Sequence, residues 1–328
     1  MTSITHLSYH LPKVKYFSSQ IKSRGIQRII QKTGIDKKYK VKNNEYATDI
    51  AVKAVEKIFY RNPDLKKKID FVIYCSQSPD FFLPQGSSFI QQKIFKESTI
   101  PSIDINSGCS GYLYCLFLAN ALLNSNSCKK ILLVTSDTYS KYIGNDDLNN
   151  RLIFGDGGSA SILEKSSSGF LQFSQGTDGT GIQDLFVINS GLRKMKHKNF
   201  KKIKDRKLIM NGLKLFDFSI SKIPNLIKEN LNKNRLQIKD IDLFILHQAN
   251  AQMLQNIRDK LHIDKKKFYI NLKNKGNTTS SSIPIALFET IKNKILRKNM
   301  KVNLCGFGVG LSWSSTVIQF NKLPKIYT

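Results

Sequence analysis

Cys109 is the side chain of this sequence that is best placed for covalent chemistry. It lies in Pro101-Ser-Ile-Asp-Ile-Asn-Ser-Gly-Cys-Ser-Gly-Tyr112, between an alternating stretch typical of a strand and an apolar stretch typical of a helix. The free N–H groups and the dipole at a helix start favour a thiolate, and can lower a cysteine pKa from about 8.5 to between about 3.5 and 7.5. The alternative is a small buried cysteine that packs as a hydrophobe. This stretch alone leaves both interpretations open.

Two further polar residues lie at the ends of predicted strands. His247 closes the apolar segment 243–246, and Asn277 lies in a Gly-Asn turn before an apolar helix. Separately, each has a simple structural explanation, as a hydrogen-bonded histidine or as turn and cap chemistry. Together with Cys109 they form a set of three reactive or polar side chains, each placed between a predicted strand and a predicted helix. Ligand chemistry in layered α/β proteins gathers at such strand ends.

The elements that position these residues follow the same plan in two halves. In the first half we predict strands over 4–9, 69–76, 101–105, 130–136 and 154–163, and helices over 14–31, 46–60, 85–95 and 112–123. In the second half we predict strands over 242–247, 267–272 and 301–305, a Gly-rich turn and strand over 306–320, and helices over 211–232, 252–261 and 282–296. This repetition indicates a layered α/β protein with two packed sheets, divided into halves 1–165 and 166–328.

Composition narrows the class of protein. The chain has 328 residues, of which 41% are hydrophobic, enough for one large domain or two fused halves. The N-terminus lacks the apolar region of a signal peptide, and the longest apolar run is too short to span a membrane. The five cysteines have no metal-ligand spacing. We therefore expect a cytoplasmic protein with reduced thiols, no metal site and no membrane segment.

The net charge of +28 is large, and one segment concentrates it. The basic loop, residues 193–207, carries nine Lys or Arg and one Asp. It is either a solvated loop or a surface for an acidic protein, an anionic membrane or a nucleic acid. Only one aromatic side chain, Phe200, lies in it. Nucleic acid is therefore the weakest of the three partners.

The order of these motifs along the chain resembles one known family, β-ketoacyl-acyl-carrier-protein synthase III. The segments that carry the resemblance are Thr33-Gly-Ile35, Gly108-Cys-Ser-Gly, Phe154-Gly-Asp-Gly157, His247-Gln-Ala-Asn, Gly276-Asn-Thr and Gly306-Phe-Gly-Val-Gly-Leu-Ser-Trp. The resemblance runs from about residue 4 to residue 320. It implies the thiolase fold, five layers αβαβα built from two similar halves, and a homodimer. It also implies a decarboxylative Claisen condensation that needs no cofactor beyond the phosphopantetheine of its substrates.

The resemblance assigns a role to each member of the set. Cys109 takes the acyl group of a primer thioester, and malonyl-acyl carrier protein then loses carbon dioxide. His247 and Asn277 donate hydrogen bonds to the enolate oxygen, whereas the backbone N–H groups of Cys109 and Val309 hold the oxyanion of the condensation step. The carrier is an acidic protein. We expect the basic loop to steer it electrostatically. The alternative is docking by helix-borne basic residues: Lys214, Arg258 and Lys260.

The chain departs from the family where the primer and its carrier bind. The Trp that stacks on the adenine of coenzyme A in the family is missing, and Arg28 falls near its place. Leu148 occupies the position where the second clamp residue, an Arg, is expected. Lys32 replaces the Arg before Thr33, and Leu83 replaces a Phe that commonly lines the primer pocket. The substrate-binding residues implied are Lys32, Thr33, Leu83 and Phe307. Without the stacking clamp we expect acyl-carrier protein to be a better primer donor than acyl-coenzyme A.

Three other functions are compatible with parts of the sequence. A cysteine protease also orders Cys, His and Asn along the chain, but the residues around Cys109 do not match that class. A non-decarboxylating acyltransferase on the same fold is the main alternative. Asn277 argues against it, because an Asp there would repel the enolate charge. A nucleic-acid-binding protein is supported only by the net charge.

Overall fold

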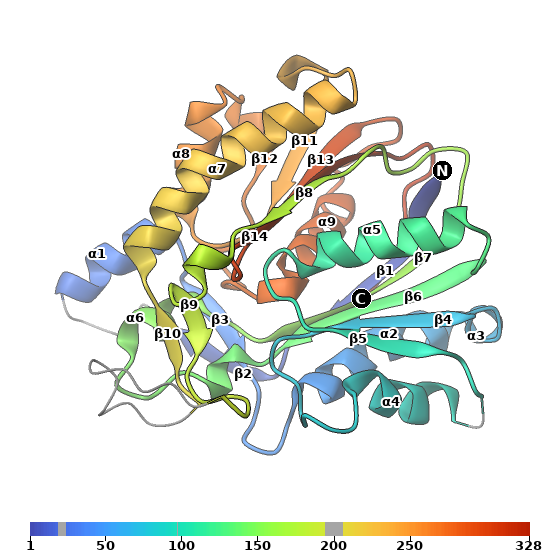
Figure 1. Ribbon diagram of the computed structural model, residues 1–328, viewed down its shortest axis with the longest axis horizontal. Coiled ribbons are helices and arrows are strands. Elements are labelled where there is room, and N and C mark those ends of the chain that lie inside the picture. The colour runs from blue at the N-terminus through green and yellow to red at the C-terminus, as the bar shows by residue number, and fades with distance from the viewer. Residues whose placement is uncertain (19–23, 97, 194–205) are drawn as a thin grey trace.

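Two large β-sheets with helices between them and outside them make up the core of the protein (Figure 1). The computed structural model describes residues 1–18, 24–96, 98–193 and 206–328. Of the basic loop, residues 194–205 lie outside the described residues, so the prediction made for them remains a prediction. Among the described residues, no helix is both long and apolar enough to cross a membrane.

The first sheet contains six strands in the order β15-β1-β7-β6-β4-β5. Their bounds are β1 Thr2–His10, β4 Phe71–Cys75, β5 Ser102–Ile105, β6 Lys130–Asp137, β7 Gly157–Lys165 and β15 Lys325–Tyr327. β4 runs parallel to both β5 and β6, whereas β7 is antiparallel to its two neighbours. Every residue of β6 after Lys130 is buried, as expected where helices cover both faces of a sheet. β5 is an edge strand.

The second sheet repeats this plan with five strands in the order β12-β11-β13-β14-β8. Their bounds are β8 Ser174–Thr177, β11 Leu243–Leu246, β12 Phe268–Tyr269, β13 Lys301–Gly308 and β14 Ser312–Gln319. β11 runs parallel to β12 and β13, and β14 is antiparallel to β13. One strand crosses between the halves, because the C-terminal β15 pairs with β1 in the first sheet.

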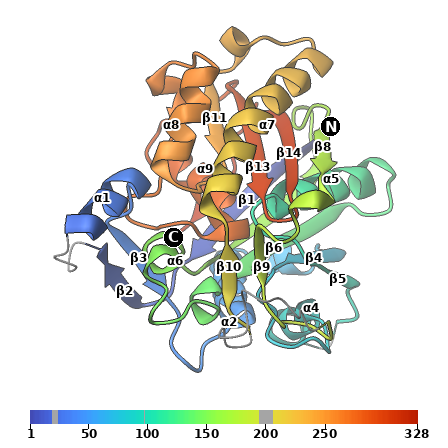
Figure 2. The same ribbon diagram turned by 60° about the vertical axis from the view of Figure 1, so that its left-hand side comes forward.

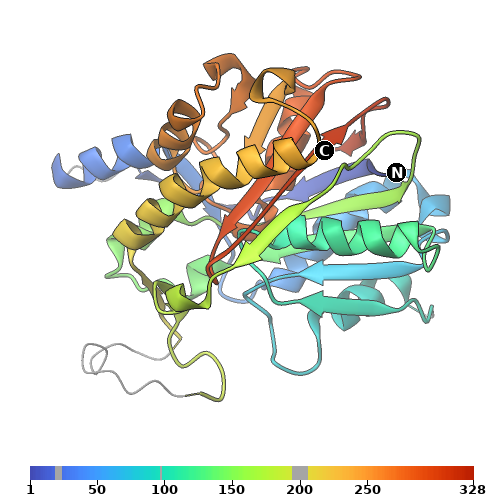
Figure 3. The same ribbon diagram turned by 45° about the horizontal axis from the view of Figure 1, so that its top comes forward.

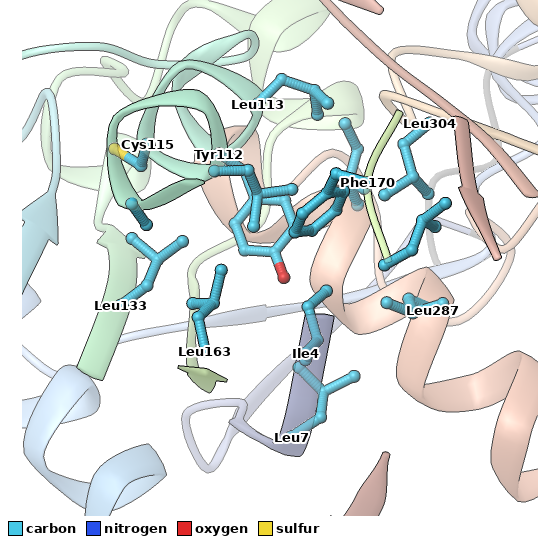
Figure 4. Close-up of a cluster of buried hydrophobic side chains, with 14 of the residues drawn as sticks. Ile4, Leu7, Tyr112, Leu113, Cys115, Leu133, Leu163, Phe170, Leu287 and Leu304 are labelled. Atoms are coloured by element: carbon cyan, nitrogen blue, oxygen red, sulfur yellow. The ribbon is translucent and has the colours of Figure 1, made fainter. Parts of the chain in front are cut away.

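Helices α5 (Gly111–Asn124) and α9 (Ser282–Lys292) form the middle layer between the sheets. Their apolar side chains join both sheets in one core, in which Leu113 and Leu287 lie near Leu133 and Leu304 (Figure 4). Helices α2 (Ala47–Arg61) and α4 (Gly86–Ile90) cover the outer face of the first sheet. Helices α7 (Gly212–Lys233) and α8 (Ala251–Lys260) cover the second (Figure 3). The predicted five-layered αβαβα arrangement is confirmed.

Smaller elements surround one end of this core (Figure 2). They are β2 Val14–Phe17, α1 Arg24–Thr33, β3 Lys37–Lys40, α6 Leu148–Ile153, β9 Leu185–Val187 and β10 Leu208–Met210. The short helix α3, Pro63–Lys66, lies at the opposite end, before β4 (Figure 1). The prediction of one helix over 14–31 is wrong at its start. Residues 14–17 form a strand that pairs antiparallel with β3, since the short alternation of Val, Tyr and Phe with Lys suits a pleated strand better than a helix.

Candidate active site

One cavity of about 110 Å³ is lined by Cys109, His247 and Asn277 together. Cys109 comes from the connection between β5 and α5, His247 from the end of β11, and Asn277 from the turn before α9. Thus the three strand ends identified in the sequence meet at one place. The remaining wall is mainly apolar and includes Phe154, Leu185, Met210, Leu215, Met253 and Phe307.

Cys109 lies two residues before the first residue of α5 and is only 4% exposed. Gly308 of β13 passes directly over it. A Cβ atom on Gly308 would lie 2.7 Å from the Cβ and 3.0 Å from the Sγ of Cys109, and its φ of +156° also disfavours a side chain. Glycine at this position therefore lets the strand approach the nucleophile closely.

The environment of Cys109 raises its pKa, whereas a helix start by itself favours a lower one. Burial raises the pKa of the thiol to about 12, helped by the negative charge of Asp137. Hydrogen bonds from the backbone N–H groups of Val309 and of Cys109 itself act in the opposite direction. The sequence shows the helix start but not the depth of burial, which outweighs it here. Burial therefore favours the thiol over the thiolate in the free protein.

His247 is a buried, neutral imidazole. Its Nδ1 atom lies 2.7 Å from Ser282 Oγ, and the same Oγ accepts a hydrogen bond of 3.4 Å from the Gln248 backbone N–H. Burial lowers the pKa of the ring to about 3, although a hydrogen bond with the Thr279 backbone acts in the opposite direction. The edge-to-face ring of Phe307, 5.7 Å away between centroids, closes another side. Such a ring can offer a neutral N–H donor to the cavity.

Asn277 is held through its backbone and through one end of its side chain. Its N–H donates to the carbonyl of Ile153 at 3.0 Å, and its carbonyl accepts from Gly155 N–H at 2.9 Å. The Thr279 backbone N–H donates to Asn277 Oδ1 at 2.9 Å. Because the amide oxygen is engaged, the side chain offers its NH₂ group to the cavity.

Asp137, at the end of β6, links the two halves beneath the cavity, and we did not identify it from the sequence. This fully buried carboxylate accepts hydrogen bonds from Gln77 N–H (2.8 Å) and Ser78 Oγ (3.2 Å) of the first half. It also accepts from Thr279 Oγ1 and Ser280 Oγ of the second half, both at 2.5 Å. Thr279 is the residue that fixes the amide of Asn277. An acidic residue at the end of an otherwise apolar strand was the available signal.

Replacing Asp137 by Asn removes this buried charge while keeping the size of the side chain. Because the carboxylate helps to raise the pKa of Cys109, we expect iodoacetamide to alkylate Cys109 faster at a given pH, by about tenfold for each pKa unit. Alkylation rates measured across the alkaline pH range give the change in the pKa of Cys109.

The matched control for this experiment is Asp156→Asn. Asp156 is also fully buried and hydrogen-bonded, but it is not among the groups that shift the pKa of Cys109. An equal change in the pKa of Cys109 in both variants, or no change in Asp137→Asn, would contradict the role given to Asp137.

Of the predicted substrate-binding residues, the structure places only Phe307 in the wall of this cavity. Thr33 is buried and donates to the Ile30 carbonyl, while Lys32 is exposed on α1. Leu83 is 87% exposed on the loop before α4. Leu83 therefore does not line this cavity within one chain, and its role in primer binding stays a prediction.

The predicted carrier-docking residues occupy two helices at different distances from the cavity. Lys214 lies in the first turn of α7, beside the cavity-lining Leu215, and its Nζ is 3.2 Å from a carboxylate oxygen of Asp184. Arg258 and Lys260 lie in the last turn of α8, beyond the part of that helix that lines the cavity. The structure therefore brings Lys214, of these three, nearest to the cavity wall.

Comparison with known proteins identifies the relatives of this chain. Residues 103–179 match the family described as 3-oxoacyl-[acyl-carrier-protein (ACP)] synthase III, and residues 231–320 match its C-terminal family. The chain is 32% identical over 297 residues to beta-ketoacyl-[acyl-carrier-protein] synthase III of Clostridium tetani, covering 88% of each chain. It is 30% identical over 322 residues to that of Fusobacterium nucleatum, covering 97% of this chain and 98% of the relative. A crystal structure of a 3-oxoacyl-(acyl-carrier-protein) synthase III superposes with a TM-score of 0.92 at 33% identity, covering 97% and 99% of the two chains.

Proposed function

The chain belongs to the 3-oxoacyl-[acyl-carrier-protein] synthase III family, and on that premise we propose that its Cys109 cavity carries out both steps of the synthase reaction. The protein is an acyltransferase that condenses an acyl primer with malonyl-acyl carrier protein to give a 3-oxoacyl-acyl carrier protein. The observation that carries the assignment of residues is the convergence of Cys109, His247 and Asn277 on one buried cavity.

In the first step Cys109 takes the acyl group. Its sulfur attacks the thioester carbonyl, the bond to the carrier sulfur breaks, and the thiol proton leaves with the departing carrier thiol. The N–H groups of Cys109 and Val309, which already bond to the sulfur, stabilise the oxyanion that forms on the carbonyl oxygen.

In the second step malonyl-acyl carrier protein loses carbon dioxide, and the electrons of the broken C–C bond move onto its thioester oxygen. This charge needs donors rather than a base. We assign the donors to Asn277 NH₂ and to the N–H of the neutral His247. Since Ser282 Oγ accepts from Gln248 N–H, its own hydrogen is available to donate to Nδ1 of His247, which leaves the ring proton on Nε2.

The enolate carbon then attacks the acyl carbonyl on Cys109. The tetrahedral intermediate collapses, the bond to the Cys109 sulfur breaks, and the product leaves on the carrier protein. The sulfur takes up one proton from solvent to restore the resting thiol. The neutral amide of Asn277 supports this decarboxylative route over a non-decarboxylating transfer, because a carboxylate there would oppose the enolate.

Intact-mass spectrometry after incubation with an acyl thioester tests the assignment. We expect one acyl group per chain, located on Cys109 by peptide mapping. Addition of malonyl-acyl carrier protein should remove that group and release one carbon dioxide per 3-oxoacyl product. Acylation at another residue, or product without loss of the acyl group from Cys109, would refute it.

We also propose an acidic acyl carrier protein as the partner that docks over Lys214. The support is the position of Lys214 at the cavity wall and its 67% exposed side chain. Acidic surfaces are attracted electrostatically to such a site. All five cysteines of the chain are free and buried, which supports a reducing compartment, the cytoplasm.

A homodimer across the edge strand β5 completes the proposal. Large apolar side chains are exposed on β5, on α5 and on the loop before α4: Phe81, Phe82, Leu83, Ile103, Phe117 and Leu118. An unpaired strand edge beside apolar surface favours pairing with another copy. In a twofold arrangement the same strand of each chain meets its own copy.

Ile103→Lys should separate the two chains. Ile103 is 44% exposed at the centre of β5, so a twofold pairing would bring two lysines close together, and like charges facing each other across strands are destabilising. Light scattering should show a dimer for the wild type and a monomer for the variant. Tyr60→Lys is the control, since Tyr60 is 89% exposed on α2. A monomeric wild type, or dissociation in both variants, would disprove this interface.

A further inference from the structure

An ion pair joins the turn that carries Asn277 to helix α9. Lys275 Nζ lies 3.6 Å from Glu289 Oε2, and the two side chains are only 14% and 11% exposed. Lys275 stands two residues before Asn277, whereas Glu289 lies toward the end of α9. The ion pair therefore ties the turn to the helix that follows it.

Tyr9 of β1 binds the other oxygen of the same carboxylate. Its hydroxyl donates to Glu289 Oε1 at 2.7 Å, and its ring packs edge-to-face on that of Phe288, 4.8 Å away between centroids. Burial and the hydrogen bond to Glu289 both raise the pKa of Tyr9, so the hydroxyl keeps its proton and remains a donor. Glu289 thus connects β1 of the first half with Lys275 of the second. We call Tyr9, Glu289 and Lys275 the anchor.

Lys275 has one acidic neighbour that compensates its charge. Burial lowers the pKa of Lys275, and Glu289 acts in the opposite direction. The other charged groups that act on it, Lys292 and Lys37, are cations and oppose its charge. Among the described residues, Glu289 is therefore the carboxylate that holds this ammonium group in its largely buried position. Removing one partner of a buried pair leaves the other uncompensated, so without Glu289 the Lys275 side chain would turn toward solvent.

The backbone of Lys275 is in close contact with its surroundings. A Cβ atom on Gly155 would lie 2.7 Å from the Lys275 carbonyl oxygen, and Gly155 N–H donates to the carbonyl of Asn277. The N–H groups of Lys275 and Gly276 both donate to the Leu272 carbonyl, at 3.1 and 2.9 Å. A movement of Lys275 therefore reaches Asn277, which is separated from it only by Gly276.

We propose that the anchor positions Asn277 to donate to the enolate oxygen. This inference rests on the proposed function, in which Asn277 NH₂ is one of the two donors. No member of the anchor lines the Cys109 cavity, so the three are positioning residues that act through Asn277. A displacement of about 1 Å can cost about 10² in rate. The anchor thus acts on decarboxylation and not on acylation, because the sulfur of Cys109 is bound by the N–H groups of Val309 and Cys109.

The anchor is tested through carbon dioxide release from malonyl-acyl carrier protein in the Cys109→Ala chain. Lys275→Met and Glu289→Gln should each lower the kcat of release by between about tenfold and 10²-fold, with KM little changed. Tyr9→Phe removes a single hydrogen bond and should cause a smaller loss of the same kind. Lys275→Arg, which keeps the positive charge, should retain most of the rate. In chains with Cys109 intact, the rate of Cys109 acylation should stay near that of the wild type.

Lys130→Met is the matched control. Lys130 forms an ion pair with Glu164 in the first sheet, and these side chains are also largely buried, 13% and 29% exposed. Breaking this pair should lower the thermal stability but leave carbon dioxide release unchanged. Repeating Lys275→Met in a chain that also carries Asn277→Ala gives a second readout. If Lys275 acts through Asn277, its effect on the rate should disappear there.

Three results would overturn the positioning role alone: unchanged release in both Lys275→Met and Glu289→Gln, an equal loss in Lys130→Met, or a full effect of Lys275→Met in the chain without the Asn277 amide. A release rate that is the same with and without Asn277→Ala would instead overturn the proposed function.

Discussion

We expect Cys109→Ala to abolish condensation but to leave a protein that still releases carbon dioxide from malonyl-acyl carrier protein. The variant has no sulfur to hold the primer, so no 3-oxoacyl product forms. His247 and Asn277 remain in the cavity wall, with their partners Ser282 and Thr279 unchanged, and can still stabilise the enolate. Carbon dioxide release and product formation, measured on the same sample, separate the two steps.

Cys128→Ala is the control for this variant. Cys128 is buried and free like Cys109, but it does not line the cavity. Its variant should retain both condensation and decarboxylation. Loss of carbon dioxide release in Cys109→Ala, with normal folding, would mean that the sulfur itself takes part in decarboxylation.

His247→Ala and Asn277→Ala are expected to have the reverse effect. Cys109 should still take an acyl group in both variants, whereas decarboxylation should fall by about 10²–10³, the usual cost of losing one donor to a developing oxyanion. Single-turnover acylation followed by carbon dioxide release checks both statements. Equal loss of acylation in the two variants would contradict this division of the steps.

A neutral His247 also predicts how the decarboxylation rate depends on pH. Since burial lowers the pKa of His247 to about 3, its ring stays neutral between about pH 5 and 8. The decarboxylation rate of the Cys109→Ala variant should therefore show no titration near the ordinary histidine value. The contrary outcome is a rate that falls below pH 6.5 in Cys109→Ala but does not depend on pH in the Cys109→Ala/His247→Ala double variant. That outcome would mean that the His247 ring changes its protonation in this range.

The layers and the three central site residues were predictable because they depend on local patterns. Apolar periodicity locates β4, β6, α5 and α9, and the parallel strands bring their carboxyl ends to one edge. Cys109, His247 and Asn277 follow from that. The strand at residues 14–17 was not predictable, because four residues of alternation compete with a longer helical pattern.

Other features of the site depend on contacts between residues far apart in the sequence. The raised pKa of Cys109 reflects burial under Gly308 and the charge of Asp137. The hydrogen bond between Tyr139 and Gln77 joins residues 62 positions apart. Such contacts exist only once the chain has folded, so a linear pattern does not contain them.

The carboxylate of Asp137 makes the catalytic residues of one half depend on the other half. It belongs to the half that carries the nucleophile, yet it holds Thr279, which orients the amide of Asn277 in the other half. A chain cut between residues 165 and 166 would thus separate Asp137 from Thr279 and Ser280, and so remove a support of Asn277. If the halves arose by duplication of one ancestral unit, each half now depends on hydrogen-bond partners in the other. A substitution of Asp137 in one half, or of Thr279 and Ser280 in the other, would leave a buried polar group without its partner.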